Sequence, residues 1–278
     1  MILSHRHRLI FFKRYKAAGS SFELALADFC GDDDIITTLF EGEEDDPSLL
    51  QFRADEAYKK FGVKRRAQNY RLTDWPNIKG IKKELKEPPA KQLERMSLWG
   101  NEEIFWRHQQ SKAIKSMMQD DIYNDYLKFA IVRNPFDKAI SWFYHRKRTA
   151  GLRELNPQTS LPFNQQDYTK PPYHGLGAND NNLVPNSELD FVLRFENLEE
   201  DIKVKLEFNL GLHGLWDKFK DINIHADYRP NRGYIDRGLT KEEDIREHYR
   251  GAYGVRDFVL KHFNETIEKY NYPIPDCK

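Results

Sequence analysis

The chain has 278 residues, and its 44 lysines and arginines are balanced by 44 aspartates and glutamates. This balance excludes a global field that would attract nucleic acid, so we expect no nucleic-acid partner and only a local anion site. With no apolar run of about eighteen residues and no signal peptide, we expect no transmembrane segment and a cytoplasmic location. Cys30 and Cys277 are too few for a disulfide framework and lack metal-ligand spacing, so we interpret both as incidental.

The first predicted element is a strand over Leu9–Phe12, a run too short for a helix and rich in aromatic and branched residues. A turn of small residues, Ala17–Gly19, follows it and would let backbone N–H groups approach a ligand. Ser20 and Ser21 are predicted to cap a helix that continues through Phe22–Ala27.

Three cations, Lys13, Arg14 and Lys16, flank this turn. Because a helix N-terminus presents unpaired donors and a partial positive charge, the segment is suited to phosphate or sulfate. An ordinary strand-to-helix turn with solvated lysines is the alternative interpretation. The P-loop pattern G-x-x-x-x-G-K-[ST] is absent, which argues against a standard ATP or GTP site.

The next segments are predicted with less detail. Residues 35–40 suit a second strand, residues 41–47 suit a solvated acidic loop, and residues 51–100 mix charges and prolines without fixing their elements. His108 follows the apolar run Glu103–Trp106 and precedes a predicted helix over Ser111–Gln119. A lone histidine is more often structural than catalytic, but its position before a helix makes His108 a candidate base.

The clearest strand in the chain is Lys128–Val132, which ends at Arg133. Asn134 is predicted to cap a helix that runs from Pro135 to about Arg148 and carries Ser141 about two turns in. A second strand-to-helix junction would therefore bring an Arg and a Ser to the carboxyl edge of the sheet, where open α/β sheets bind ligands.

The remainder contains a long polar segment over about 149–188, which we interpret as a lid or insert of the domain. A strand over Leu189–Phe195 and a helix opening at Glu196 are predicted next. A basic loop, the segment His248–Arg250 and a terminal helix to about Lys269 complete the chain.

These motifs together resemble the sulfotransferases that use 3′-phosphoadenosine-5′-phosphosulfate (PAPS), especially the bacterial and phage branch akin to carbohydrate sulfotransferases. Lys16–Ser21 is similar to the family's 5′-phosphosulfate loop, and Phe129–Lys138 with Ser141 is similar to its 3′-phosphate signature. Weaker matches are His108, Leu193–Leu198 and the tail from His248. The resemblance covers most of the chain except roughly 41–100 and 149–186. Lys13-Arg14-Tyr15 departs from the His-x-Pro that is commoner in the family before the lysine.

The resemblance implies an α/β fold with three α/β/α layers, a central parallel sheet and a P-loop-NTPase-like arrangement. It implies in-line, metal-independent transfer of a sulfuryl group from PAPS to a hydroxyl or amine of a small-molecule or carbohydrate acceptor, with 3′-phosphoadenosine-5′-phosphate (PAP) as product. Lys16 would stabilise the leaving oxygen and His108 would act as base, because histidine in general, with an unperturbed pKa of about 6.5, is suited to this work near neutrality. The implied donor-binding residues are Lys13, Arg14, Lys16, Ala17, Ala18, Gly19, Ser20, Ser21, Phe22, Arg133, Ser141, Tyr249 and Arg250.

Two other classes remain open from the sequence. A P-loop kinase or NTPase would need a Walker A loop and an acidic Mg²⁺ ligand, whereas the clearest strand ends in Arg133. A nucleotide-binding module without catalysis would need neither His108 nor a lid. If His108 is not the base, Glu196 and His174 are the next candidates, because a carboxylate near an anionic donor can have a raised pKa.

Overall fold

The computed structural model describes residues 1–39, 47–70, 104–106, 108–149, 180–222, 224 and 238–278. The chain divides into two compact units. The first unit comprises Met1–Arg14, Ala18–Val132 and Asp180–Ile224, and the second comprises Tyr15–Ala17, Arg133–Asn179 and His225–Lys278. A single domain over the whole chain remains a prediction. The predicted insert at about 149–188 lies mostly outside the described residues.

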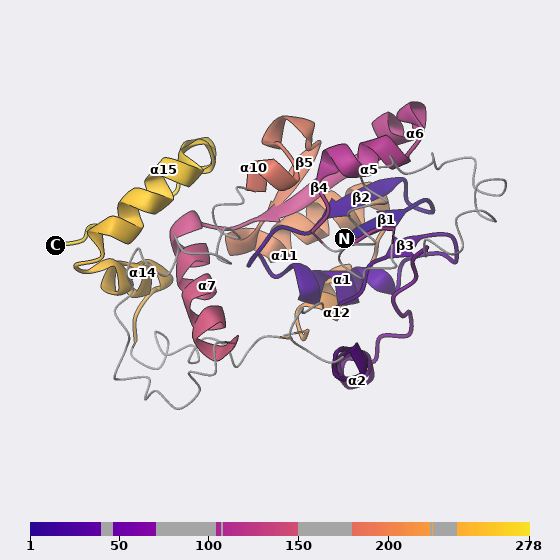
Figure 1. Ribbon diagram of the computed structural model, residues 1–278, viewed down its shortest axis with the longest axis horizontal. Helices are drawn as coiled ribbons and strands as arrows, with labels where there is room; N and C mark the ends of the chain where they lie inside the picture. Colours follow the sequence, from indigo (N-terminus) through magenta and orange to yellow (C-terminus); the bar gives the residue numbers. More distant parts are fainter. Residues whose placement is uncertain (40–46, 71–103, 107, 150–179, 223, 225–237) are drawn as a thin grey trace. The chain divides into compact units, whose positions relative to one another are not determined.

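The first unit contains a five-stranded sheet with the order β3-β1-β2-β4-β5 (Figure 1). Strands β2 (Leu9–Phe12), β4 (Leu127–Val132) and β5 (Phe191–Arg194) are parallel neighbours. Strand β1 (Ile2–Ser4) is antiparallel to both β2 and β3 (Ile35–Ile36). The prediction of a parallel sheet therefore holds for its middle and is wrong for the β1–β3 edge.

The antiparallel edge depends on the buried carboxylate of Asp34. It accepts hydrogen bonds from the Ser4 hydroxyl at 2.6 Å, from the His5 N–H at 2.7 Å and from the Gly31 N–H at 2.7 Å. Burial opposes ionisation of this group, but the hydrogen bonds outweigh it and lower the pKa of Asp34. The Asp34 side chain thus fixes the turn between β1 and β2.

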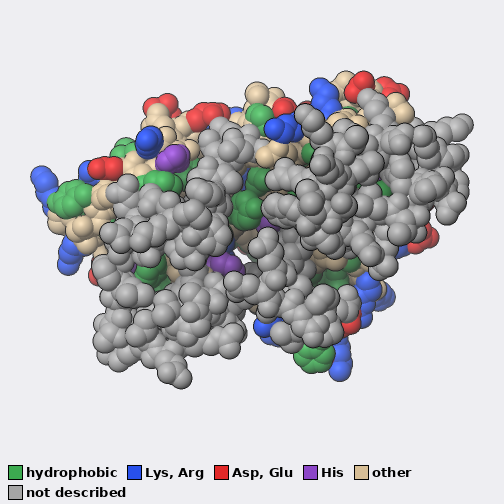
Figure 2. All heavy atoms as spheres, in the orientation of Figure 1, with side chains coloured by type: hydrophobic (Ala, Val, Ile, Leu, Met, Phe, Trp, Pro, Cys, Tyr) green, Lys and Arg blue, Asp and Glu red, His purple; other side chains and the backbone are tan. Residues whose placement is uncertain are grey.

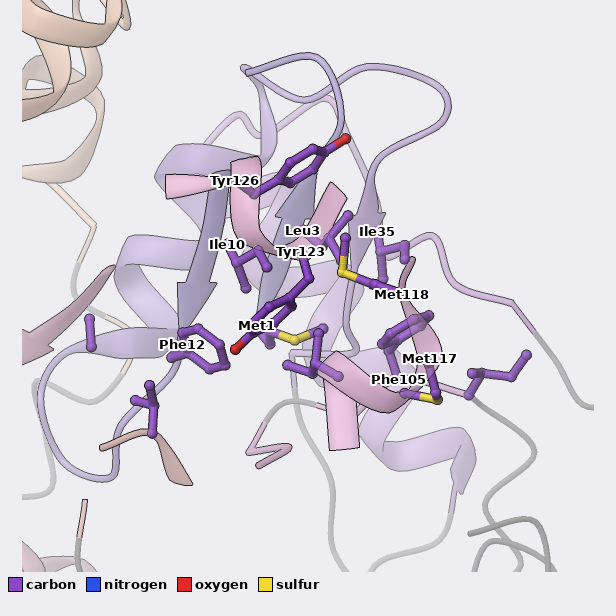
Figure 3. Packing of buried hydrophobic residues seen from close by; sticks show 14 residues of the cluster. Met1, Leu3, Ile10, Phe12, Ile35, Phe105, Met117, Met118, Tyr123 and Tyr126 are labelled. Atoms are coloured by element: carbon purple, nitrogen blue, oxygen red, sulfur yellow. The ribbon is translucent and has the colours of Figure 1, made fainter. Parts of the chain in front are cut away.

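One face of the sheet is covered by α5 (Ser111–Met117) and α6 (Asp120–Asp125). Figure 3 shows Ile10 and Phe12 of β2 in the same buried cluster as Met117 and Tyr123. The helix predicted over Ser111–Gln119 corresponds to α5, and Ile114, Met117 and Met118 of this segment are all buried.

The opposite face packs against α1 (Gly19–Ala27) and α12 (Leu215–Phe219). The Phe11 and Phe22 ring centroids are 4.7 Å apart, and those of Phe22 and Phe219 are 5.9 Å apart. Because successive strand residues face opposite sides of a sheet, Phe11 reaches this layer while Phe12 reaches the other. Helices therefore cover both faces of the sheet in the first unit, as a three-layer α/β/α arrangement requires. A P-loop-NTPase-like detail remains a prediction.

The first unit also contains several shorter elements and one longer helix. They are α2 (Pro47–Lys60), α10 (Asp180–Leu183), the 3₁₀ turns η3 (Asn186–Glu188) and η4 (Phe195–Asn197), α11 (Leu198–Asp201) and the π-helix η5 (Ile202–Phe208).

The second unit is helical, with α7 (Pro135–Thr149), α14 (Lys241–Tyr249) and α15 (Tyr253–Tyr270) around one apolar cluster. The predicted Asn134 cap is confirmed, because its side-chain oxygen accepts a hydrogen bond from the Phe136 N–H at 2.9 Å. The terminal helix is also confirmed, whereas α14 was not predicted. It begins with a capping box in which Thr240 and Glu243 bond each other's backbone N–H groups.

On the face drawn in Figure 2, acidic and basic side chains of the described residues both appear, as the zero formal net charge leads one to expect. Within the described ranges, no helix is long and apolar enough to cross a membrane.

Candidate functional site

The loop between β2 and α1 adopts an unusual backbone conformation. Lys16 and Ala18 have φ values of 55° and 59°, in the left-handed region that non-glycine residues rarely occupy. Such residues cost about 1–3 kcal/mol each, and they concentrate at functional sites. The loop is therefore held in a conformation that free peptide would avoid.

The start of α1 has no side-chain cap. Its N-cap is Ala18, and no side chain bonds the first-turn N–H groups. The prediction that Ser20 and Ser21 cap the helix is wrong, because both lie inside its first turn, and the Ser21 hydroxyl instead accepts a hydrogen bond from the Ile224 N–H at 3.4 Å. A helix end without a side-chain cap offers its N–H groups to water or to an anion.

Two cationic residues of the second unit, Lys16 and Arg133, are neighbours in the fold. The Arg133 Nη1 donates a hydrogen bond to the Lys16 carbonyl oxygen at 2.9 Å. Burial, and secondarily the positive charge of Arg133, lower the pKa of Lys16 to about 7. Both effects disfavour the charged form of the Lys16 side chain.

Asp137 holds the Arg133 guanidinium. Its fully buried carboxylate accepts from Arg133 Nε at 2.7 Å and pairs with Lys241 Nζ at 2.9 Å. We assigned Asp137 no role of its own from the sequence, although its position four residues after Arg133 at the start of a helix was a usable signal. Ser141 is half-buried about two turns along α7.

His108 lies in the first unit and contacts the end of β2. Its Nδ1 is 2.8 Å from the Lys13 carbonyl oxygen. Since a carbonyl can only accept, Nδ1 must carry the proton in this hydrogen bond, and the neutral ring then has its lone pair on Nε2. This is the tautomer that a general base acting through Nε2 requires. Residue 107 lies outside the described residues.

Four of the predicted donor-binding side chains are buried inside their own units. Lys13 forms an ion pair with Glu23, and Arg14 Nη2 donates to the Val184 carbonyl oxygen at 2.9 Å and to Asn186 Oδ1 at 3.0 Å. Phe22 belongs to the aromatic layer described above. These side chains contact the protein interior in the structure, and their part in donor binding remains a prediction.

Tyr249 is the fourth of these side chains and is fully buried, with its hydroxyl donating to the Phe136 carbonyl oxygen at 3.3 Å. Burial, aided by the charge of Asp137, raises the pKa of Tyr249 well above its usual value. The neighbouring Arg250 is exposed at the end of α14, and Glu196 is exposed in η4. His174 and the predicted insert around it lie outside the described residues.

Of the other loop residues, Ala17 and Gly19 are buried, whereas Ala18 and Ser20 are partly exposed. Among the residues that the structure describes, no group of His, Cys, Asp and Glu side chains is arranged to hold a metal ion. Cys30 and Cys277 are both free and buried.

Comparison with known proteins identifies the family. A family model described as the sulfotransferase family matches residues 1–224, which include β2, α1, His108, β4 and the start of α7. No curated protein and no solved structure matches the chain. Because the match extends over well more than half of the sequence and includes both strand-to-helix junctions, the chain belongs to the sulfotransferase family.

Proposed function

We propose that the protein transfers a sulfuryl group from PAPS to a hydroxyl or amine of a small-molecule or carbohydrate acceptor, releasing PAP. The observation that carries this proposal is the contact between Arg133 and the Lys16 backbone. It joins the residue after β4 to the loop after β2, so two cations that are far apart in sequence are available to one anionic ligand. PAPS, with about four negative charges on its phosphates and sulfuryl group, fits such a pair.

Each residue has a defined part in this scheme. The side chain of Lys16 and the backbone N–H groups of Gly19–Ser21 hold the 5′-phosphosulfate, and the absence of a side-chain cap on α1 supports this assignment. Arg133 and Ser141 hold the 3′-phosphate, with Asp137 fixing the guanidinium. Charge-assisted hydrogen bonds of this kind contribute roughly 1.5–3 kcal/mol each.

Transfer requires stabilisation of a leaving oxygen and removal of a proton from the acceptor. Lys16, once protonated, neutralises the charge that develops on the bridging oxygen. His108 takes the acceptor proton through Nε2, and the hydrogen bond from Nδ1 to Lys13 supports this direction of proton flow. No step in the scheme needs a metal ion.

Two measurements test the proposal. Isothermal titration with PAP and with ATP, each with and without Mg²⁺, separates a PAPS enzyme from a kinase: we expect PAP to bind more tightly, independently of Mg²⁺. Mass spectrometry of an acceptor panel incubated with PAPS should then detect an added sulfonate. Mg²⁺-dependent preference for ATP would refute the donor assignment, and PAP binding without turnover on any acceptor would support a non-catalytic module.

A further inference from the structure

Lys13, at the start of the loop between β2 and α1, has a side chain that is buried against the protein. Its side chain is 4% exposed, and its Nζ forms an ion pair with Glu23 of α1, whose side chain is 3% exposed. Glu23 also accepts from the Met1 amino group and lies 3.5 Å from the Thr37 hydroxyl. A buried ion pair contributes little net stability, but removal of Glu23 would take the carboxylate away from both the Lys13 ammonium and the Met1 amino group.

The aliphatic part of Lys13 lies across the first residue of α1. A Cβ added to Gly19 would stand 2.6 Å from Lys13 Cγ and 3.4 Å from its Cε. Gly19 is therefore needed because the lysine stem occupies the space of a side chain, and the ion pair with Glu23 anchors that stem one turn further along the same helix. The start of α1 and the end of β2 are fixed to each other through one residue.

The backbone of the same residue fixes His108. The Lys13 carbonyl oxygen accepts the Nδ1 hydrogen bond that selects the tautomer with an Nε2 lone pair. A displacement of Lys13 would thus disturb two groups of the proposed site: the start of α1, which would bind the donor, and the His108 ring, which would take the acceptor proton.

We propose that Lys13 and Glu23 form a positioning pair that aligns the start of α1 with the His108 ring, and that the Lys13 ammonium does not bind the donor. The inference rests on the proposed function and assigns the pair a part in it. Glu23 gave no signal in the sequence as a member of the site, because its significance comes only from the partner that it meets in the fold.

Titration with PAP distinguishes the pair from a direct donor contact. Lys13→Met keeps most of the stem and removes the charge, and we expect about tenfold or more weaker PAP binding because Glu23 loses one of its two cationic partners and no longer anchors the stem. Lys13→Met/Glu23→Gln removes both charges and should return the affinity to within about threefold of the original protein. If the ammonium touches the donor instead, the double variant will remain as weak as Lys13→Met, and the proposal is overturned.

Glu23→Gln alone provides a second test if the lysine variants fail to fold. A positioning pair predicts weaker PAP binding, whereas a direct donor contact predicts equal or tighter binding, because a negative charge beside the lysine has been removed. Lys218→Met is the matched control: this lysine pairs with Asp28 at the other end of α1, and its loss should leave PAP affinity unchanged.

Nitrogen-15 NMR of histidine-labelled protein supplies a readout that does not need turnover. The His108 ring, identified by its absence in His108→Gln, should show a protonated Nδ1 and an unprotonated Nε2. This tautomer preference should weaken in Glu23→Gln and recover in Lys13→Met/Glu23→Gln, an effect that general destabilisation would not reverse. If the protein binds no PAP but the His108 tautomer responds in this way, the proposed function is wrong and the positioning role of Lys13 and Glu23 is supported. If the tautomer does not respond to these substitutions, the positioning role is wrong.

Discussion

PAP binding should draw a proton onto Lys16, and this prediction tests the electrostatics of the site directly. In the free protein, burial and the neighbouring Arg133 lower the pKa of Lys16 to about 7. An anionic phosphate placed against the ammonium would favour the charged form and raise that pKa again toward the usual 10.5 of a lysine. Binding and protonation are therefore linked, and each strengthens the other.

The size and sign of the effect follow from the lowered pKa. At pH 8 about one tenth of the free Lys16 side chains carry a proton, so saturation with PAP should take up about 0.9 proton per molecule. Affinity should be highest below about pH 7 and should fall as pH rises, by nearly tenfold per unit between about pH 8 and 10. The ligand contributes little at these values, because the second phosphate pKa is about 6.

Isothermal titration at pH 8 in buffers of different ionisation enthalpy measures the number of protons directly. Lys16→Met should abolish the uptake even if it also weakens binding, and Lys218→Met should retain it because that lysine is exposed in an ion pair with Asp28. Proton uptake close to zero in the original protein, or equal uptake in Lys16→Met, would show that Lys16 is not the group that senses the ligand.

Three further predictions concern the remaining site residues. Arg133→Ala and Ser141→Ala should each weaken PAP binding by about tenfold or more while changing the affinity for adenosine 5′-phosphate little; equal losses for both nucleotides would remove these residues from the 3′-phosphate site. His108→Ala should lower turnover by about 10²–10⁴-fold with nearly unchanged PAP affinity, and it should remove an ionisation through which the rate rises with pH. Near-normal turnover would instead assign the general base to Glu196 or His174. Asp137→Asn should lower the free energy of unfolding by about 3 kcal/mol in urea titrations, because its buried carboxylate compensates both Arg133 and Lys241, and an unchanged stability would contradict that account.

The two strand-to-helix junctions were predictable because their signals are local. An apolar run followed by small residues defined β2 and the start of α1, and the Asn134-Pro135 pair defined the start of α7. In each case the propensity of neighbouring residues agrees with the structure that they adopt. Such agreement needs no knowledge of distant contacts.

The features that sequence reasoning missed depend on contacts between distant residues or on very short elements. Strand β1 has three residues, too few to show a periodic pattern, and it is fixed by Asp34 from beyond the next helix. Lys13 appeared to be a solvated or ligand-binding cation, and only the fold brings it against Glu23. A charged residue's role therefore depends on whether the fold provides a partner for it, which composition and spacing do not reveal.

In the second unit, a single carboxylate, that of Asp137, is shared by two cations. Asp137 compensates Arg133 and Lys241 together, so the three groups retain one excess positive charge. Lys16, whose carbonyl oxygen accepts a bond from the same Arg133, adds a further charge when it is protonated, and its lowered pKa shows that the free protein tolerates that charge poorly. Lys16 therefore has two protonation states. Without a ligand, loss of its proton relieves the repulsion between Lys16 and Arg133. A bound anion would relieve the same repulsion and allow Lys16 to stay charged. Because the charged form is the one that can stabilise a leaving oxygen, the ligand itself would bring Lys16 into the state that transfer requires.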